Sequence, residues 1–180
     1  MARALRLSAA ALAALRAHAA AEHPREACGF LLGPAAEGLP PETRRPGEGR
    51  GLGPDEAPLP AQDPGLRRDD DKESASGLRT AALVDESRPS PNLAAPGRLD
   101  VFELDAALHL RLQREARAAG RRIVGLYHSH PASAPIPSPR DREGAYDHGL
   151  VWLIVGADGA CRAWWPGPDG FCEAYLEVCP

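Results

Sequence analysis

Two histidines and an aspartate near the end of one apolar stretch have the types and spacing to bind a metal ion. His128 and His130 follow the apolar residues 123–127 and are separated by a single residue. Alternate side chains of a β-strand share a face, with Cα atoms about 6.5–7 Å apart, so both imidazoles could reach one ion. Asp141 would add a carboxylate, and three such ligands leave a fourth tetrahedral position for water, as in catalytic zinc sites.

The segment between these histidines and Asp141 could return the carboxylate to the end of the strand. Four prolines stiffen it, at positions 131, 135, 137 and 139. Ser138 has the features of a helix N-cap, because Pro139 occupies the first helical position and Asp141 lies three residues after the cap. The sequence therefore predicts a short helix that begins after Ser138 and holds the carboxylate near both imidazoles.

Each of these residues also has a purely structural explanation. His128 and His130 could close the end of a strand, and Ser138 with Asp141 could form nothing more than a capping box. Taken one at a time, the structural explanation is the better one. Four specified residues at fixed spacing, however, arise by chance on the order of once in a thousand such chains, which favours a shared metal site.

The pattern His-x-His, seven residues, then Ser-x-x-Asp resembles the zinc motif of the JAMM (MPN-plus) metallopeptidases. In that family a glutamate on an early strand, just ahead of an apolar run ending in glycine, completes the site. Residues 23–33, HPREACGFLLG, resemble this second block and place the family's glutamate at Glu26. Glu22 lies on a predicted helix and matches less well. The likeness is nearest to the stand-alone bacterial and archaeal members of the family.

The resemblance implies a single MPN-type domain of the α/β class, cytidine-deaminase-like in fold, with a central mixed sheet flanked by helices. It implies a zinc ion held by His128, His130 and Asp141. Glu26 would accept a proton from the attacking water and deliver one to the leaving amine, while Ser138 would help to stabilise the oxyanion. The implied partner is a protein substrate, a ubiquitin-like sulfur carrier cleaved at a peptide or isopeptide bond of its C-terminal tail.

Other functions stay open from the sequence. A non-catalytic MPN scaffold or interaction module is expected where the ligand set has decayed, whereas here the ligands and Glu26 are intact. A RadC-type relative linked to DNA carries a similar motif, but the acidic charge balance and the residues around Glu26 argue against it. A zinc cytidine deaminase would carry Pro-Cys-x-x-Cys, which the sequence lacks.

Hydrophobic periodicity predicts the scaffold that positions these motifs. We expect strands at residues 5–7, 27–32, 80–84, 101–104, 122–130, 149–157, 161–165 and 171–178. We expect helices at residues 9–22 and from the N-cap Asp105 to the C′ glycine Gly120. The pair Asp158-Gly159 predicts a tight hairpin. Ser129, between the two histidines, should face the opposite side of its strand and serve a structural role.

Residues 34–77 differ from the rest of the chain in composition. They contain 8 Pro and 7 Gly in 44 residues, and no aromatic residue occurs between Phe30 and Phe102. Such a segment buries too little apolar surface to offset the entropy lost on ordering it. We therefore predict a disordered insertion at 34–77 within one metallopeptidase domain formed by residues 1–33 and 78–180.

Charge and hydropathy narrow the class of protein. The 25 acidic residues and 21 Lys and Arg residues leave a net charge of −4, so no basic excess indicates a nucleic-acid partner. The sequence contains no run of 18 apolar residues, and it therefore predicts no membrane span. The N-terminal stretch superficially resembles a secretory signal, but Arg16 and His18 interrupt it and Ser8 suits a helix N-cap. We expect a cytoplasmic protein, and the sequence leaves its oligomeric state open.

The remaining cysteines and histidines have structural interpretations. The four cysteines, Cys28, Cys161, Cys172 and Cys179, form no C-x-x-C pair, and we expect buried or edge thiols. Cys28 lies two positions after Glu26, but nothing basic at suitable spacing would activate it as a nucleophile. His18, His109 and His148 fall on helices or at helix ends, and we expect them to face solvent.

Overall fold

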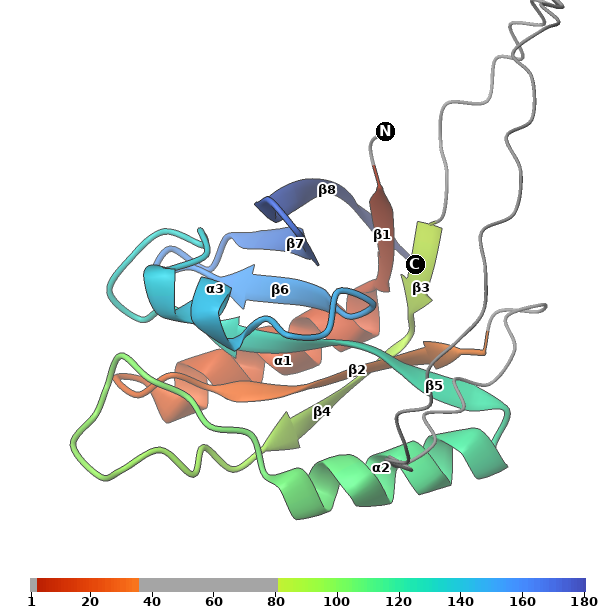
Figure 1. Cartoon of the computed structure of the whole chain (residues 1–180), viewed down its shortest axis with the longest axis horizontal. Coiled ribbons are helices and arrows are strands. Elements are labelled where there is room, and N and C mark those ends of the chain that lie inside the picture. The colour runs from red at the N-terminus through yellow and green to blue at the C-terminus, as the bar shows by residue number, and fades with distance from the viewer. Residues whose placement is uncertain (1–2, 36–80) are drawn as a thin grey trace, which may run out of the picture. The chain divides into compact units, whose positions relative to one another are not determined.

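The computed structural model describes residues 3–35 and 81–180, which form eight strands and three helices (Figure 1). In chain order these are β1 (Ala4–Ser8), α1 (Ala9–Glu22), β2 (Cys28–Pro34), β3 (Ala81–Val84), β4 (Glu86–Ser90), α2 (Ala106–Ala118), β5 (Arg121–Ser129), α3 (Pro139–Gly144), β6 (Val151–Val155), β7 (Cys161–Gly167) and β8 (Gly170–Cys179). The α/β class and the mixed sheet flanked by helices are therefore as predicted.

The strands form one sheet in the order β3-β1-β8-β7-β6-β5-β2-β4. Three neighbouring pairs are parallel, β1/β3, β1/β8 and β5/β6, and the others are antiparallel. The end strands β3 and β4 are separated in sequence only by Asp85. The Asp85 amide donates to Leu32 O of β2 (3.1 Å), and its carbonyl accepts from the Ser8 hydroxyl at the end of β1 (3.2 Å). The sheet thus curls until its two ends meet.

Helix α1 packs against one face of this sheet. Ser8 caps it by accepting from the Ala11 amide (3.1 Å), and the helix ends two residues before Pro24, which cannot continue it. Its residues Ala11 and Leu15 join a buried core with Leu31, Val124 and other apolar side chains from β1, β3, β6, β7 and β8. In Figure 1, α1 runs behind β2 and β5.

Helix α2 covers the opposite face of β2 and β5. Asp105 caps it through the amides of Ala107 and Leu108, and Gly120 follows with a φ of +67°. Its buried side chains Leu112 and Ala116 contact Phe30, Leu32 and Ile123, which alternate along their strands with residues facing α1. Farther along β5, Tyr127 joins the core on the α1 side, so the next residue, His128, faces the side that α2 covers.

Strands approach closely at Gly29, in the block that resembles the family. A Cβ atom at this position would overlap Arg88 O of β4 and the ring of Tyr127 on β5. Glycine is therefore required there by packing, because any side chain would push β2 away from the strand that carries the histidines.

Several expectations about single elements were wrong. Residues 101–104 form a loop rather than a strand, and β4 was not predicted because the polar sequence ESRPS has no strand pattern.

Two histidines that were expected to face solvent are partly buried. His18 lies on the buried face of α1 with Ala11 and Leu15, and its Nδ1 is 3.0 Å from the Tyr127 hydroxyl. His109 stacks on Phe30 with ring centroids 5.0 Å apart, whereas His148 is exposed as expected.

The predicted disordered insertion lies outside the described residues except for Pro34 and Ala35, and the domain limits stay a prediction. All four cysteines are among the described residues, and none of them forms a disulfide. Within the described part of the chain, the structure has no helix both long and apolar enough to cross a membrane.

Candidate metal centre

Strand β5 brings His128 and His130 to one place. The strand is held on both sides, since Cys28 of β2 and Ile154 of β6 lie opposite His128. The His130 amide donates to Val155 O (2.8 Å), which continues the pairing one residue beyond the strand. Both imidazoles are buried, with His128 fully inaccessible.

Ser129 points to the other face, as predicted, and has a defined structural role. Its hydroxyl accepts from the Ala27 amide (2.8 Å), and its own amide donates to Ala27 O (2.9 Å). The residue between the two histidines therefore fixes the backbone next to Glu26.

The short helix α3 supplies Asp141. Ser138 caps the helix, because its hydroxyl accepts from the Asp141 amide (3.1 Å) while its own amide donates to Asp141 Oδ2 (2.6 Å). The preceding loop is anchored by the Trp164 indole, which donates to Pro135 O (3.0 Å). The capping box predicted as the structural explanation is thus present, and the same box holds the carboxylate against the histidines.

The side chains of these three residues converge. His128 Nε2 and His130 Nε2 are 3.0 Å apart, and they lie 3.3 and 3.4 Å from the two carboxylate oxygens of Asp141. Among the described residues these three form a cluster whose candidate ligand atoms all lie within 4.8 Å of one another, and all three residues are buried. The sequence prediction of a common site for His128, His130 and Asp141 therefore agrees with their placement.

The protonation pattern of the cluster suits a cation. His130 Nδ1 lies 3.1 Å from Ala134 O, a carbonyl that can only accept, so one proton sits on Nδ1 and Nε2 is left to face the cluster. His130 Nε2, His128 Nε2 and the carboxylate point toward one another. Nitrogen and oxygen ligands of tetrahedral zinc would be separated by about 3.3 Å, close to the three separations seen here. The donor set and its spacing therefore fit a zinc-sized divalent ion.

Electrostatics favour the ionised carboxylate. Burial alone would raise the pKa of Asp141, but hydrogen bonds with His128 and His130 and from the Ser138 amide outweigh that effect and hold the pKa well below its usual range. Burial lowers the pKa of His128, so its imidazole is neutral near pH 7. The pKa of His130 is raised instead, because its hydrogen bonds to Asp141 and Ala134 O outweigh its burial. A bound cation would take the place of the proton on its Nε2, since histidine binds metals through a deprotonated nitrogen.

Glu26 lies beside this cluster, on the segment that leads into β2. It is buried, with 7% of its surface exposed, and it lines the same cavity as His130 and Ser138. Burial raises the pKa of the Glu26 carboxyl to about 7, with His130 opposing the rise and Asp141 adding to it. The alternative acid, Glu22, instead lies on α1 with its carboxylate 3.9 Å from His18.

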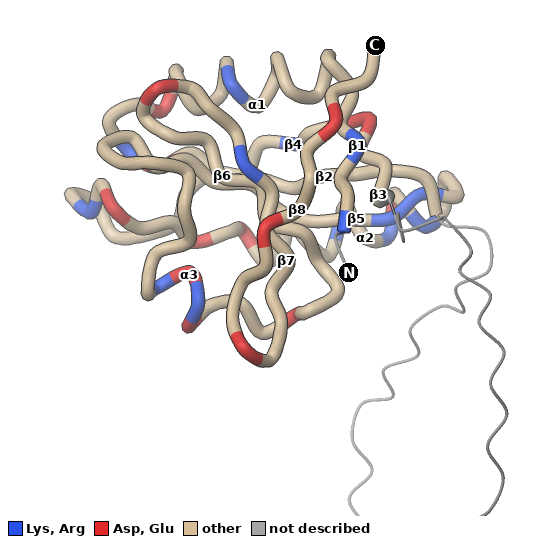
Figure 2. The backbone as a smooth tube through the Cα atoms, turned by 90° about the horizontal axis from the view of Figure 1, so that it is seen from above, with Lys and Arg blue, Asp and Glu red and all other residues tan. Residues whose placement is uncertain are grey.

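Two cavities meet at these residues. An outer cleft of about 590 Å³ opens between the Pro131–Pro139 loop and the loop that carries Leu99 and Asp100. An inner cavity of about 230 Å³ is lined mainly by apolar side chains, including Phe102, Leu126 and Trp152. Glu26, Asp100, Ser138 and Arg140 line both. Helix α3, which contributes Arg140 to both linings, carries acidic and basic residues side by side along the backbone (Figure 2).

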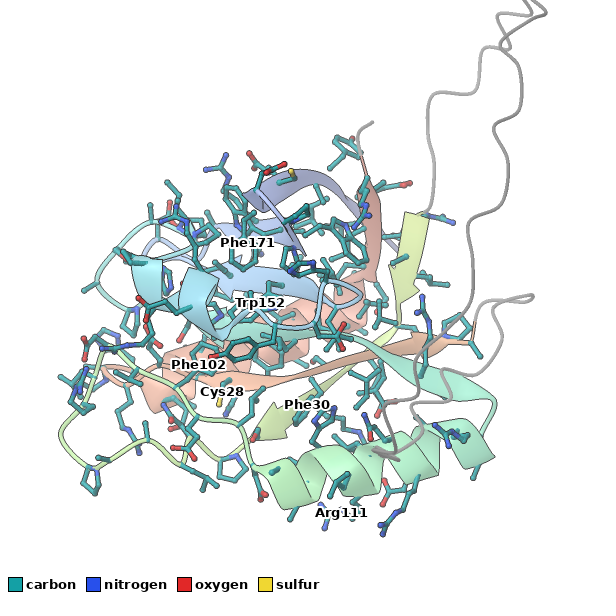
Figure 3. All side chains as sticks on the ribbon, in the orientation of Figure 1. Cys28, Phe30, Phe102, Arg111, Trp152 and Phe171 are labelled. Atoms are coloured by element: carbon teal, nitrogen blue, oxygen red, sulfur yellow. The ribbon has the colours of Figure 1, made fainter. Side chains whose placement is uncertain are left out.

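Sequence reasoning missed the aromatic cover of the site. Phe102 stacks on His128 with centroids 4.4 Å apart, and Trp152 meets the same imidazole edge-on at 5.7 Å. Phe102 and Trp152 lie close to each other beside α3 (Figure 3). Phe102 was predicted to lie on a strand. Hydrophobic periodicity does not tell an aromatic residue in a loop over a site from an aromatic residue in the core. Cys28 is buried and its pKa is raised to about 12, as expected for a packed thiol.

Comparison with known proteins gives one family. Residues 8–167 match the family model of prokaryotic homologs of the JAB domain. The chain is 39% identical over 104 residues to a desampylase of Haloferax volcanii, covering 57% of this chain and 73% of that protein. It is 30% identical over 94 residues to a probable TtuB-protein conjugate cleaving protease of Thermus thermophilus, covering 52% of this chain and 62% of that protein.

A solved structure supports the same architecture. The solution structure of a protein from Desulfitobacterium hafniense superposes with a TM-score of 0.67 at 21% identity, covering 97% of this chain and 92% of that one. At this level of identity the similarity establishes the fold.

Proposed function

Because the chain belongs to the family of prokaryotic homologs of the JAB domain, we propose that it is a zinc-dependent metallopeptidase of the JAMM type. Membership confirms the resemblance read from the motifs and the MPN-type fold, and the relatives' names indicate a hydrolase. The observation that carries the zinc proposal is the convergence of His128, His130 and Asp141 beside a buried glutamate.

In this proposal, the three clustered residues are the metal ligands. A zinc ion held by them would supply Lewis acidity to a water nucleophile and to the carbonyl of the scissile bond. His130 is kept in the required tautomer by Ala134 O, and Asp141 is kept ionised by His128, His130 and the Ser138 amide. These contacts orient the proposed ligands.

Glu26 is proposed as the general base and then the general acid. Its carboxyl faces the cavity shared with His130 and Ser138, and a pKa of about 7 suits a group that both takes and gives a proton near neutral pH. It would remove a proton from the attacking water and deliver one to the departing amine nitrogen as the C–N bond breaks.

Ser138 is proposed to stabilise the developing oxyanion. Its oxygen already accepts from the Asp141 amide, so the hydroxyl hydrogen is free to donate into the cavity that Ser138 lines. A donor placed before the reaction starts stabilises negative charge that appears only in the transition state.

The proposed substrate is the C-terminal tail of a ubiquitin-like sulfur carrier joined to another protein. The names of the Haloferax and Thermus relatives support this, the second describing cleavage of protein conjugates. The outer cleft, between two loops, could receive an extended tail. A cytoplasmic location, where such conjugates would be met, is part of the same proposal.

The experiment compares two substrates that end in the same carrier tail. One carries an isopeptide bond to a lysine side chain, and the other a linear peptide bond. We expect the protein with zinc to cleave at least the isopeptide, a chelator to abolish cleavage and added zinc to restore it. Cleavage that survives chelation would contradict the zinc mechanism, whereas zinc binding without cleavage would favour the non-catalytic scaffold.

A further inference from the structure

Asn92 lies at the start of the loop between β4 and α2 and makes four hydrogen bonds through its side-chain amide. The Nδ2 group donates to Glu26 O and to Val101 O, both at 2.9 Å. The Oδ1 atom accepts from the amides of Ala94 and Glu103, both at 3.0 Å. One half-buried side chain thus joins both ends of the loop to Glu26, two residues before β2.

The bond to Glu26 falls where the regular sheet has not yet begun. Strand β2 starts at Cys28, so the backbone of Glu26 is outside the ladder. Arg25 reinforces the contact in the reverse direction, because its Nη2 donates to Asn92 O (3.1 Å) and to Ala94 O (3.0 Å). The segment that carries the glutamate and the loop therefore hold each other through reciprocal side-chain to backbone bonds.

The other contacts of Asn92 lie on either side of Phe102. Val101 O and the Glu103 amide are both bound to the same amide group, so the backbone of Phe102 is fixed from both directions. The Phe102 ring stacks on His128 at 4.4 Å. Asn92 is therefore linked through the backbone to two side chains that border the metal cluster from different sides.

We propose that Asn92 is a positioning residue for the reaction, which sets Glu26 and Phe102 relative to His128, His130 and Asp141. This inference rests on the proposed function, since it assigns Glu26 the proton transfer that the positioning serves. Asn92 itself lies among neither the ligands nor the residues that line the two cavities. Proton transfer depends steeply on placement, and a misplacement of about 1 Å can cost on the order of a hundredfold in rate.

A merely structural role is the competing explanation, and Ser90 provides the matched control. Its hydroxyl accepts from the Asp105 amide (3.1 Å) and so ties the far end of the same loop, without touching Glu26 or the neighbours of Phe102. Ser90→Ala should loosen the loop and lower the melting temperature, yet change kcat by less than about threefold. Asn92→Ala should reduce kcat on the order of a hundredfold, with KM within about twofold and bound zinc unchanged.

The Asn92→Asp variant tests the donor atom of the side-chain amide separately from its acceptor atom. The aspartate keeps the acceptor for Ala94 and Glu103 but places a second acceptor opposite Glu26 O and Val101 O. We expect the amides of Ala94 and Glu103 to stay protected from hydrogen exchange while kcat still falls at least tenfold. If the Asn92 and Ser90 variants lost the same amount of kcat for the same loss of melting temperature, the proposal would be overturned.

A second measurement keeps this test independent of the proposed function. The side-chain carboxyl carbon of Glu26 is followed by NMR in the full chain at fixed pH. Both Asn92 variants should shift its resonance, and Ser90→Ala should not. Wild-type protein that cleaves no substrate would defeat the proposed function alone, whereas an unmoved Glu26 resonance would defeat the positioning role.

Discussion

Histidine and carboxylate side chains meet on both faces of strand β5, and the two groups differ in a way that distinguishes a structural contact from a candidate site. On the α1 face, His18 bonds the hydroxyl of Tyr127 at 3.0 Å and lies 3.9 Å from a carboxylate oxygen of Glu22. On the opposite face, His128 and His130 meet the carboxylate of Asp141. Both clusters combine partly or fully buried imidazoles with an acid, so burial and composition alone do not distinguish them.

The difference lies in donors and acceptors. The Tyr127 hydroxyl can donate to the imidazole of His18, which satisfies both groups, and burial lowers the pKa of that histidine so that it stays neutral. In the second cluster the proton on His130 Nδ1 is used by Ala134 O, and the Nε2 atoms of both histidines converge on an ionised carboxylate. That carboxylate also raises the pKa of His130, so this cluster favours a positive charge at its centre, whereas the His18 cluster does not.

The largest difference is expected from removing one histidine of each cluster. His128→Ala should abolish zinc binding and all cleavage, because two ligands hold the ion poorly. His18→Ala should keep both and lose only stability, by about 1 kcal/mol for the lost hydrogen bond. Zinc stoichiometry and turnover of the two variants decide this, and loss of zinc in the His18 variant would contradict the division between faces.

The two glutamates give the next comparison. Glu26→Gln should keep the zinc and lower kcat by about 10²–10⁴, because a positioned general base contributes about that much. Glu22→Gln, on the other face, should leave kcat unchanged. Full activity of the Glu26 variant would remove that residue from the mechanism and leave the metal site intact.

The two helix-capping serines test a smaller effect. Ser8 caps α1 and Ser138 caps α3 by the same type of bond. Either change to alanine should cost about 0.5–2 kcal/mol of stability. Only Ser138→Ala should also reduce kcat, by about tenfold or more, since only its hydroxyl lines the cavity. Equal kcat in both variants would assign Ser138 to capping alone.

Stability against pH supplies a test that does not use activity. Burial raises the pKa of Glu26 to about 7 in the folded chain, above its ordinary value of about 4.3 when unfolded. Between these values the unfolded chain releases a proton that the folded chain keeps, so this group lowers stability as pH rises and has no further effect above about pH 7. Glu26→Gln removes this dependence.

In zinc-free protein, the gain in melting temperature of Glu26→Gln over wild type should therefore be smallest near pH 4 and should grow up to about pH 7. Thermal unfolding at a series of pH values measures it. A constant difference across this range would mean that Glu26 is not desolvated as its burial indicates.

Local signals in the sequence were sufficient to bring the three candidate ligands together and to predict most elements. The period of two placed His128 and His130 on one face and Ser129 on the other, and the capping pattern placed Asp141. Glu26 came from the family resemblance. Its burial and its raised pKa depend on long-range packing, which no local pattern encodes.

The loop around Asn92 was predicted incorrectly because its structure depends on a contact between distant residues. Val101 and Phe102 were predicted to form a strand because β-branched and aromatic residues favour strands. In the structure the Val101 carbonyl and the Glu103 amide instead bond the Asn92 side chain.

His18 and His109 were expected to face solvent. Their positions on the helices do not reveal the residues packed against them, which are Tyr127 and Phe30 respectively.

The most direct test of the central claim is the zinc content of purified wild-type protein beside Asp141→Asn and His128→Ala, measured by mass spectrometry after exposure to zinc and removal of the excess. The convergence of the three buried ligands predicts one zinc per wild-type chain and none in either variant. Wild-type protein that retains no zinc, or variants that retain it fully, would contradict the metal site.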